Sequence, residues 1–152
     1  MLRIIFLTLF ILAMFAACGR ADASGFNREG ELSFVRADTI LATIDIEIAD
    51  DIPQRTRGLM YRQSMDERHG MLFIFEQAEP RRFWMKHTAI SLDILFADSA
   101  GVIVAIETYT TPFSKTGIPC NEDALYVVEV NAGYAAARGI RLGDRIEWAR
   151  ED

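Results

Sequence analysis

Two stretches of the chain alternate apolar and polar side chains, over residues 43–48 and 90–96. A period of two residues is typical of a strand that buries one face against a core. Residues 71–75 form an uninterrupted apolar run of strand length. The residues at 76–80 predict a turn, after which residues 82–86 return as the second strand of a hairpin.

A second hairpin is predicted where the strand at 90–96 meets the turn-forming residues 98–101 and the apolar residues 102–106. Residues 110–123 contain two prolines and one glycine and form the longest irregular stretch of the domain. Long loops in compact domains often carry function. Two further strands are predicted, at residues 126–130 and 140–148.

Capping residues predict two short helices. Asp51 and Pro53 suit the first turn of one helix, because acidic residues and proline both favour a helix N-terminus. Asn131 can cap a second helix that ends before Gly139. About seven strands and two short helices, without a regular β-α-β alternation, predict an α+β, mainly β domain. Its architecture is either a compact antiparallel sheet or a partly open β-barrel.

The chain begins with the pattern of an export signal. A short positive start, Met1–Arg3, precedes the apolar and uncharged run Ile4–Ala17. The residues before Cys18 resemble the lipobox of bacterial lipoproteins, in which the cysteine sulfur is acylated. An ordinary signal peptidase could instead cut after Ala23. We therefore expect residues 1–17 to be a signal peptide, extended to residue 23 if the second site is used.

These features predict an exported protein. Acylation of Cys18 would anchor it to a membrane, and Gly19 in place of Asp favours the outer membrane; cleavage after Ala23 would release it into the periplasm. Residues 18–30 are small and polar and are predicted to form a flexible tether, followed by one β-rich domain over residues 31–152. Cys18 is acylated in the first scheme and removed in the second, so Cys120 is expected to be unpaired.

The charge of the chain is acidic overall but basic in one region. Its formal net charge is −6, which disfavours general binding of nucleic acid. Residues 52–90 nevertheless carry seven cations against four acidic side chains. Such a region can bind an anion or can be a solvated surface of ion pairs. The two histidines, His69 and His87, lack partners at metal-ligand spacing, so neither a metal nor a cofactor is predicted.

Five blocks of sequence resemble one protein family. They are Arg57–Arg62, Gly70–Phe75, Phe83–Thr88, Leu92–Phe96 and Tyr126–Val130. In this order and spacing the chain resembles the family of domain of unknown function 192, over about residues 44–146. The resemblance implies a compact β-rich fold and a short bacterial or archaeal protein, often exported. It implies no activity, cofactor or substrate.

Three positions depart from the family pattern. His87 stands where asparagine is usual, Ile52 where threonine is common and Ser91 where proline is common.

A basic and aromatic strand face is the leading candidate site. If residues 82–86 form a strand, Arg82, Trp84 and Lys86 share one face. Sugar rings stack on indole, and arginine or lysine binds carboxylate or phosphate. The leading hypothesis is non-catalytic binding of an anionic saccharide or envelope polymer. The alternative is a Trp that caps the core under its neighbouring cations. The candidate ligand-binding residues are Arg57, Arg62, Arg82, Trp84, Lys86, His87 and Asp93.

Two carboxylates set among apolar residues support a second hypothesis. Asp93 and Glu129, with Lys86 as a partner of Asp93 from the preceding strand, could form the acid-base site of a hydrolase or lyase. The same trio could instead be a structural ion-pair network. A third hypothesis is a purely structural assembly module, whose protein partner the sequence does not identify.

Overall fold

The computed structural model describes residues 25–151. The predicted signal peptide, Cys18 and the alternative cleavage site after Ala23 lie outside the described residues. Seven strands form one sheet, with bounds β1 Gly30–Arg36, β2 Thr39–Ala49, β3 His69–Phe83, β4 Leu92–Ala97, β5 Ile103–Glu107, β6 Ile118–Asn131 and β7 Arg145–Arg150. Two short helices, α1 (Ile52–Arg57) and α2 (Tyr134–Ala137), complete the fold.

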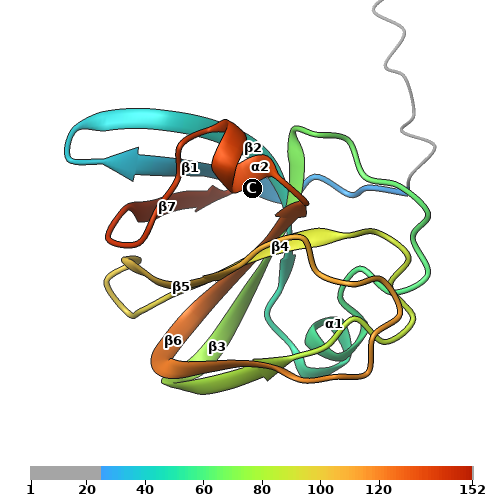
Figure 1. The fold of residues 1–152 in the computed structure, drawn as a ribbon. Coiled ribbons are helices and arrows are strands. Elements are labelled where there is room, and N and C mark those ends of the chain that lie inside the picture. The colour runs from blue at the N-terminus through green and yellow to red at the C-terminus, as the bar shows by residue number, and fades with distance from the viewer. Residues whose placement is uncertain (1–24, 152) are drawn as a thin grey trace, which may run out of the picture.

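The sheet curls into a half-barrel, as Figure 1 shows. Its strand order is β5-β4-β6-β3-β2-β1-β7, and every neighbouring pair is antiparallel except the parallel pair β2 and β3, which α1 connects. The two edges approach each other, because the Ile103 amide donates to the Asp144 carbonyl at 2.8 Å and the Ile146 amide donates to the Gly101 carbonyl at 2.8 Å. The mainly β, α+β prediction of about seven strands and two short helices is confirmed.

The predicted hairpin over residues 71–86 is wrong. β3 continues through residues 76–80 and ends at Phe83, so Trp84 and Lys86 follow the strand. The reason is the partner strand: β6 pairs with β3 both at Ile74 and at Phe83, with irregular register between them. For the same reason the predicted irregular stretch at 110–123 becomes strand from Ile118 onward.

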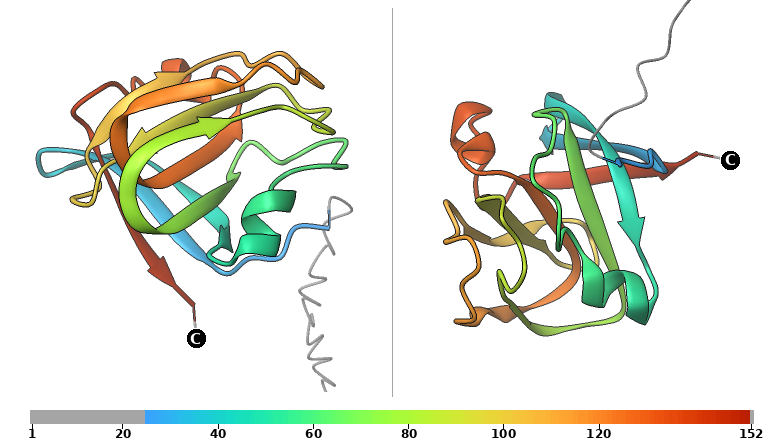
Figure 2. Two further views of the ribbon diagram at one scale, coloured as in Figure 1. Left: turned by 90° about the horizontal axis from the view of Figure 1, so that it is seen from below. Right: turned by 90° about the vertical axis from the view of Figure 1, so that its right-hand side faces the viewer.

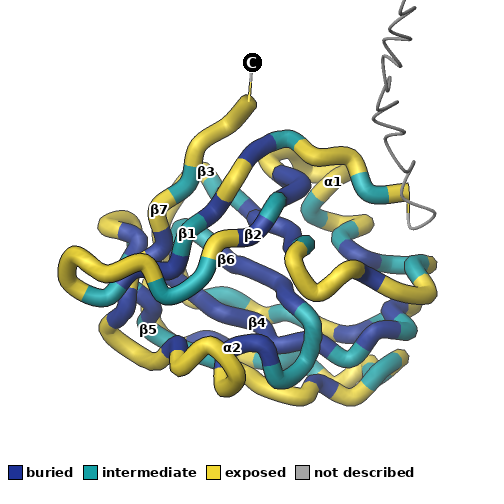
Figure 3. The backbone as a smooth tube through the Cα atoms, turned by 90° about the horizontal axis from the view of Figure 1, so that it is seen from above, coloured by how far each residue is buried: buried dark blue, intermediate teal, exposed yellow. Residues whose placement is uncertain are grey.

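Strand β4 is buried on both of its faces. All six of its residues are buried, and alternate side chains join two separate core clusters. Figure 3 shows this buried backbone through β4 and β6, while many of the connecting loops are exposed. The sequence pattern at residues 90–96 had predicted one buried face. Consequently, a polar side chain on β4 must find its partners inside the protein.

The helix caps agree with the prediction at α1 and differ at α2. Asp51 accepts a hydrogen bond from the Gln54 amide at 2.7 Å, and Gln54 accepts in return from the Asp51 amide at 3.2 Å. This reciprocal arrangement is a capping box. Helix α2 begins after Gly133, whereas Asn131 donates to the Met65 carbonyl at 3.0 Å.

The segment before β1 is bound to the domain rather than free. The Asn27 amide donates to Glu47, and Glu29 accepts from the Ile48 amide at 2.7 Å. The Phe26 ring stacks on His69 at 3.7 Å between centroids. The predicted tether over residues 18–30 therefore does not extend through residues 26–29. Within residues 25–151, no helix has the length and apolar character that crossing a membrane requires.

Candidate functional site

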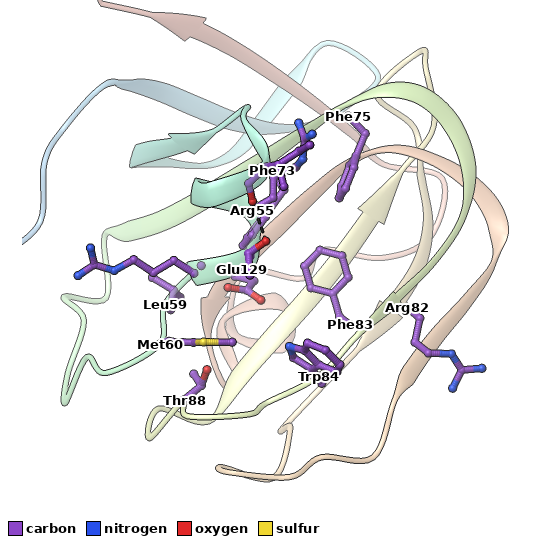
Figure 4. Close-up of a pocket in the computed structure, with 14 residues that line it drawn as sticks. Arg55, Leu59, Met60, Phe73, Phe75, Arg82, Phe83, Trp84, Thr88 and Glu129 are labelled. Atoms are coloured by element: carbon purple, nitrogen blue, oxygen red, sulfur yellow. Dashed lines mark hydrogen bonds between the residues drawn. The ribbon is translucent and has the colours of Figure 1, made fainter.

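A pocket of about 260 Å³ opens between α1 and strand β3 (Figure 4). Its lining is mainly apolar, and Glu129 of β6 is the only acidic residue that residues 25–151 contribute to it. The apolar lining residues are Ile52, Leu59, Met60, Phe73, Phe75, Phe83 and Trp84. Ligand pockets are typically concave and apolar with a few placed polar groups, and this pocket has that character.

Packed aromatic rings hold the pocket wall in place. The Phe83 ring meets the rings of Phe73 and Phe96 edge-on, at centroid distances of 5.2 and 5.6 Å. Such edge-to-face contacts favour one ring orientation. Gly58 brings the backbone close to the wall, because a Cβ at this position would lie 3.2 Å from the Phe73 ring and 3.9 Å from Glu129 Oε2. The shape of the pocket is therefore built into the fold.

Glu129 presents a buried carboxyl to this pocket, as Figure 4 shows. Its side chain is nearly inaccessible, with 5 % exposure, and has no hydrogen bond or ion pair with any other residue in the described range 25–151. Burial raises the pKa of the Glu129 carboxyl to about 8, because the charged form loses its hydration. At neutral pH the carboxyl is thus mainly protonated and can both donate and accept a hydrogen bond.

Three arginines line the pocket, and the structure uses them differently. Arg55 donates to the Ile74 carbonyl and to Glu76, each at 2.8 Å, and its guanidinium lies over the Phe75 ring. Arg57 and Arg82 are exposed and have no hydrogen bond or ion pair to any residue between 25 and 151. Figure 4 shows the Arg82 guanidinium turned away from Glu129, toward the outside. The neutral acid therefore lies inside the pocket, and two arginines without a partner among residues 25–151 belong to its exposed lining, the Arg82 guanidinium facing outward.

Trp84, like Arg82, is a predicted platform residue that is both exposed and in the pocket lining. Its side chain is 52 % exposed, and the Lys86 ammonium lies 5.9 Å from its ring centroid. Arg62 lies away from this pocket in a mostly buried ion pair with Glu47, at 2.5 Å from Nη1 to Oε2. His87 stacks on the Tyr61 ring at 5.3 Å. The pocket therefore gathers Arg57, Arg82, Trp84 and Glu129 from the predicted residues.

Asp93 has a different environment from the one predicted. Its carboxylate accepts hydrogen bonds from the amides of Tyr109, Gly133 and Ala135, each at 3.0 Å. These donors, and not Lys86, are its partners. In the β4–β6 ladder Asp93 pairs with Val130, while its neighbour Ile94 pairs with Glu129. Because successive side chains alternate across a sheet, Asp93 and Glu129 lie on opposite faces. The structure does not bring the predicted trio together.

Cys120 is buried with a free thiol. Burial raises the pKa of this thiol, which keeps it protonated. Among residues 25–151, no three His, Cys, Asp or Glu side chains gather as metal ligands.

Sequence reasoning missed most of the pocket wall. It did not select Leu59, Met60, Phe73, Phe75 or Phe83 as site residues. The available signal was the clustering of aromatic residues on β3 together with the basic residues before it. Apolar side chains on a strand read as core in a sequence, and only the placement of α1 over β3 shows that some of them line a cavity.

The family model of domain of unknown function 192, described as "Uncharacterized ACR", matches residues 33–148. The chain belongs to this family. The matched range includes every residue that lines the pocket, from Ile52 to Glu129. The resemblance inferred from the five sequence blocks is thereby confirmed.

Curated relatives from two archaea carry the name UPF0127. The protein from Pyrococcus abyssi is 32% identical over 108 residues, covering 68% of this chain and 85% of the relative. The protein from Pyrococcus furiosus is 28% identical over 112 residues, covering 70% of this chain and 89% of the relative.

Two solved structures share the fold of this domain of unknown function 192. One is a candidate transcription regulator from Sinorhizobium meliloti, with a TM-score of 0.76 and 37% identity, covering 82% of this chain and 98% of that one. The other is a protein of unknown function from Novosphingobium aromaticivorans, with a TM-score of 0.74 and 30% identity, covering 78% of this chain and 84% of that one.

Proposed function

We propose that the domain binds a small ligand non-catalytically in the pocket between α1 and β3. The ligand has a ring-shaped or apolar body and an anionic end. The observation that carries this proposal is the Glu129 carboxyl, which is buried, without a partner in the described chain, and directed into an aromatic pocket. A buried polar group without a partner is unfavourable for folding, so a ligand that supplies the missing hydrogen bond would be favoured.

The distribution of charge along the pocket lining predicts how the ligand is oriented. The body contacts the rings of Phe83 and Trp84 and forms a hydrogen bond with neutral Glu129. The anionic group stays at the mouth, where Arg57 and Arg82 are free to pair with it. At about 260 Å³ the pocket lies near the lower limit for ligand sites. An anionic saccharide or envelope polymer would therefore insert only one terminal unit.

The proposed setting is the cell envelope. The N-terminal sequence supports export, and the residues before Cys18 support a lipid anchor, with release into the periplasm as the alternative. The name of the Sinorhizobium meliloti structure raises nucleic acid as another ligand. A formal net charge of −6 argues against it, so we do not propose DNA binding.

For a catalytic role, Glu129 would have to act without Asp93. The trio of Asp93, Glu129 and Lys86 is divided by the sheet, since Asp93 faces away from the pocket. A neutral carboxyl in an apolar pocket is suited to act as a general acid. Acid-base hydrolysis of glycosides usually needs a second carboxylate, and no other acidic residue of the described range 25–151 lines this pocket. Binding without turnover is therefore the better-supported function.

Two matched pairs of probes test the proposal. In the Trp148→Phe chain Trp84 is the only tryptophan, so its fluorescence reports the pocket. We expect glucuronate or phenylacetate to bind more tightly than glucose or phenylacetamide, because only the first two carry a carboxylate. The double variant Arg57→Gln/Arg82→Gln should weaken the anionic probes by about tenfold, which corresponds to ~1.4 kcal/mol.

Arg141→Gln is the control, because Arg141 is exposed and lies outside the pocket. It should leave the affinity unchanged. No change of Trp84 fluorescence with millimolar probe would contradict the proposal. So would equal affinity for the anionic and neutral probes in the unsubstituted pocket.

A further inference from the structure

Three loops meet at one end of the half-barrel, and we name them together the loop end. They are residues 58–65, 84–91 and 109–117, which follow α1, β3 and β5. Figure 2 shows these loops close together beside α1 in both views. The elements that carry them are far apart in sequence, so the loop end is a product of the fold.

Backbone hydrogen bonds join the three loops. The Tyr61 amide donates to the His87 carbonyl at 2.8 Å, which connects the first loop to the second. The Phe113 amide donates to the Thr88 carbonyl at 3.0 Å, which connects the third loop to the second. These bonds hold the backbone of all three loops in one arrangement.

Large apolar side chains are exposed at this end. Within residues 25–151, seven large hydrophobic residues are exposed, and five of them belong to α1 or to the loop end. These five are Ile52, Tyr61, Trp84, Tyr109 and Phe113, with exposures between 52% and 72%. Single exposed apolar residues are common, but a cluster of aromatic residues on one surface marks an interaction site.

The backbone holds several of these aromatic residues in an unfavourable conformation. Tyr61, Tyr109 and Phe113 have positive φ angles of 68°, 51° and 61°. His87, in the same loop cluster, has a φ of 58°. Left-handed backbone costs a non-glycine residue about 1–2 kcal/mol. Because the loops keep this conformation and still expose the rings, burial in the core does not explain the aromatic side chains.

The charge of the loop end is opposite to that of the whole chain. Among residues 25–151 its unpaired cations are Lys86 and Lys115, whereas Arg62 is paired with Glu47, and its residues include no aspartate and no glutamate. The chain as a whole carries a formal net charge of −6. Aromatic rings among lysines are typical of protein surfaces that lie in the headgroup region of a membrane.

We propose that the loop end docks the domain onto the surface of an anionic lipid bilayer. Trp84, Tyr109 and Phe113 enter the headgroup region, and Lys86 and Lys115 pair with lipid phosphates. The uncharged apolar run Ile4–Ala17 in the preceding sequence is consistent with a chain that meets a membrane. This docking does not depend on a ligand in the pocket, so either proposal can fail while the other stands.

The depth of Trp84 in the bilayer tests the proposal on the full chain. The Trp148→Phe chain, with Trp84 as its only tryptophan, is mixed with vesicles of equal parts phosphatidylglycerol and phosphatidylcholine. Half of the samples contain lipids brominated on the acyl chain, which quench nearby indole. We expect brominated vesicles to quench Trp84. Vesicles of phosphatidylcholine alone should quench it less, because they lack negative charge.

The reciprocal Trp84→Phe chain is the control. It leaves Trp148 on β7, packed against Tyr126 and outside the loop end, so brominated lipid should not quench it. This comparison reports which surface meets the lipid, even if the N-terminal segment attaches the chain to the vesicle.

Two further variants locate the contributions within the loop end. Lys86→Gln/Lys115→Gln should reduce Trp84 quenching in anionic vesicles, and Tyr61→Ser/Phe113→Ser should reduce it in both kinds of vesicle. Equal emission of Trp84 in brominated and unbrominated vesicles would overturn the proposal. Equal quenching of Trp84 and Trp148 would also overturn it.

Discussion

Glu129 makes the stability of the fold depend on pH. Its pKa rises from an ordinary value of 4.5 to about 8 in the folded protein. Between these values the folded state keeps a proton that the unfolded state has lost. The free energy of unfolding is therefore highest below the unfolded pKa and falls as pH rises toward about 8, by on the order of 3–5 kcal/mol. Glu129→Gln removes this dependence, because the amide stays neutral throughout.

Urea unfolding at a series of pH values measures this difference. We expect Glu129→Gln to be more stable than the unsubstituted chain at about pH 8 and to lose that advantage at about pH 5. Glu122→Gln is the matched control, because Glu122 lies on the same strand but is exposed. A difference between Glu129→Gln and the unsubstituted chain that does not change with pH would contradict the prediction.

Arg62 belongs to the structure rather than to the pocket. Its guanidinium forms two contacts with Glu47, at 2.5 and 2.8 Å, and both side chains are mostly buried. Arg62→Met leaves the Glu47 carboxylate without its partner, which should lower the free energy of unfolding by about 3 kcal/mol. Probe binding to the folded variant should be unchanged. Weaker binding with unchanged stability would return Arg62 to the ligand-binding residues.

Asp93 organises the elements at one end of β4. From a fully buried position it accepts backbone amides from the loop after β5 and from the start of α2. Oδ1 accepts two of these amides, and Oδ2 accepts the amide of Ala135. In Asp93→Asn an NH₂ group replaces one carboxylate oxygen and faces a backbone N–H donor, so at least one hydrogen bond is lost. We expect a loss of about 2–4 kcal/mol in the free energy of unfolding.

Asp98→Asn is the control for this substitution. Asp98 also accepts two backbone amides, from Ala100 and Val102, but both go to the same oxygen. An asparagine can keep both bonds, so its stability in urea should change little. Similar losses at the two positions would show that Asp93 does not depend on its second oxygen.

The sequence predicted elements best where one local signal determines them. Asp51 and Pro53 located α1, and the alternation before residue 50 located β2, whose Ile44, Ile46 and Ile48 are buried. The prediction failed in the middle of β3. Its exposed residues show no period of two, and only pairing with β6 holds them in a strand. Pairing between residues far apart in sequence leaves no local pattern.

The candidate site was predicted in part, for a related reason. Composition selected Arg57, Arg82, Trp84 and Glu129, but not the phenylalanines that form the wall between them. Position 87 has a physical explanation that only the structure supplies. With a φ of 58°, it lies in the left-handed region that asparagine tolerates well, in agreement with the asparagine that the family resemblance led us to expect there.

At the scale of the whole molecule, the half-barrel depends on contact between its two edges. Residues 101–103, at the start of β5, meet the residues around β7 through backbone hydrogen bonds and the bridge between Val102 and Arg145. These bonds join opposite ends of the strand order. We call this contact between the two edges the seam. Because it links the two ends of the sheet, a substitution at the seam should affect the entire fold.

Gly101 tests the seam, because a Cβ there would lie 2.7 Å from the Ile146 carbonyl oxygen. Gly101 has a φ of +77°, and Gly143, with a φ of +86°, has open space where its Cβ would be. Gly101→Ala and Gly143→Ala therefore share the backbone strain of about 1 kcal/mol, and only the first disrupts the seam. We expect Gly101→Ala to lower the free energy of unfolding by about 2 kcal/mol more than Gly143→Ala. Amide hydrogen exchange at Ile146 should accelerate in Gly101→Ala alone; equal effects of the two substitutions would mean that the edges of the sheet do not depend on each other.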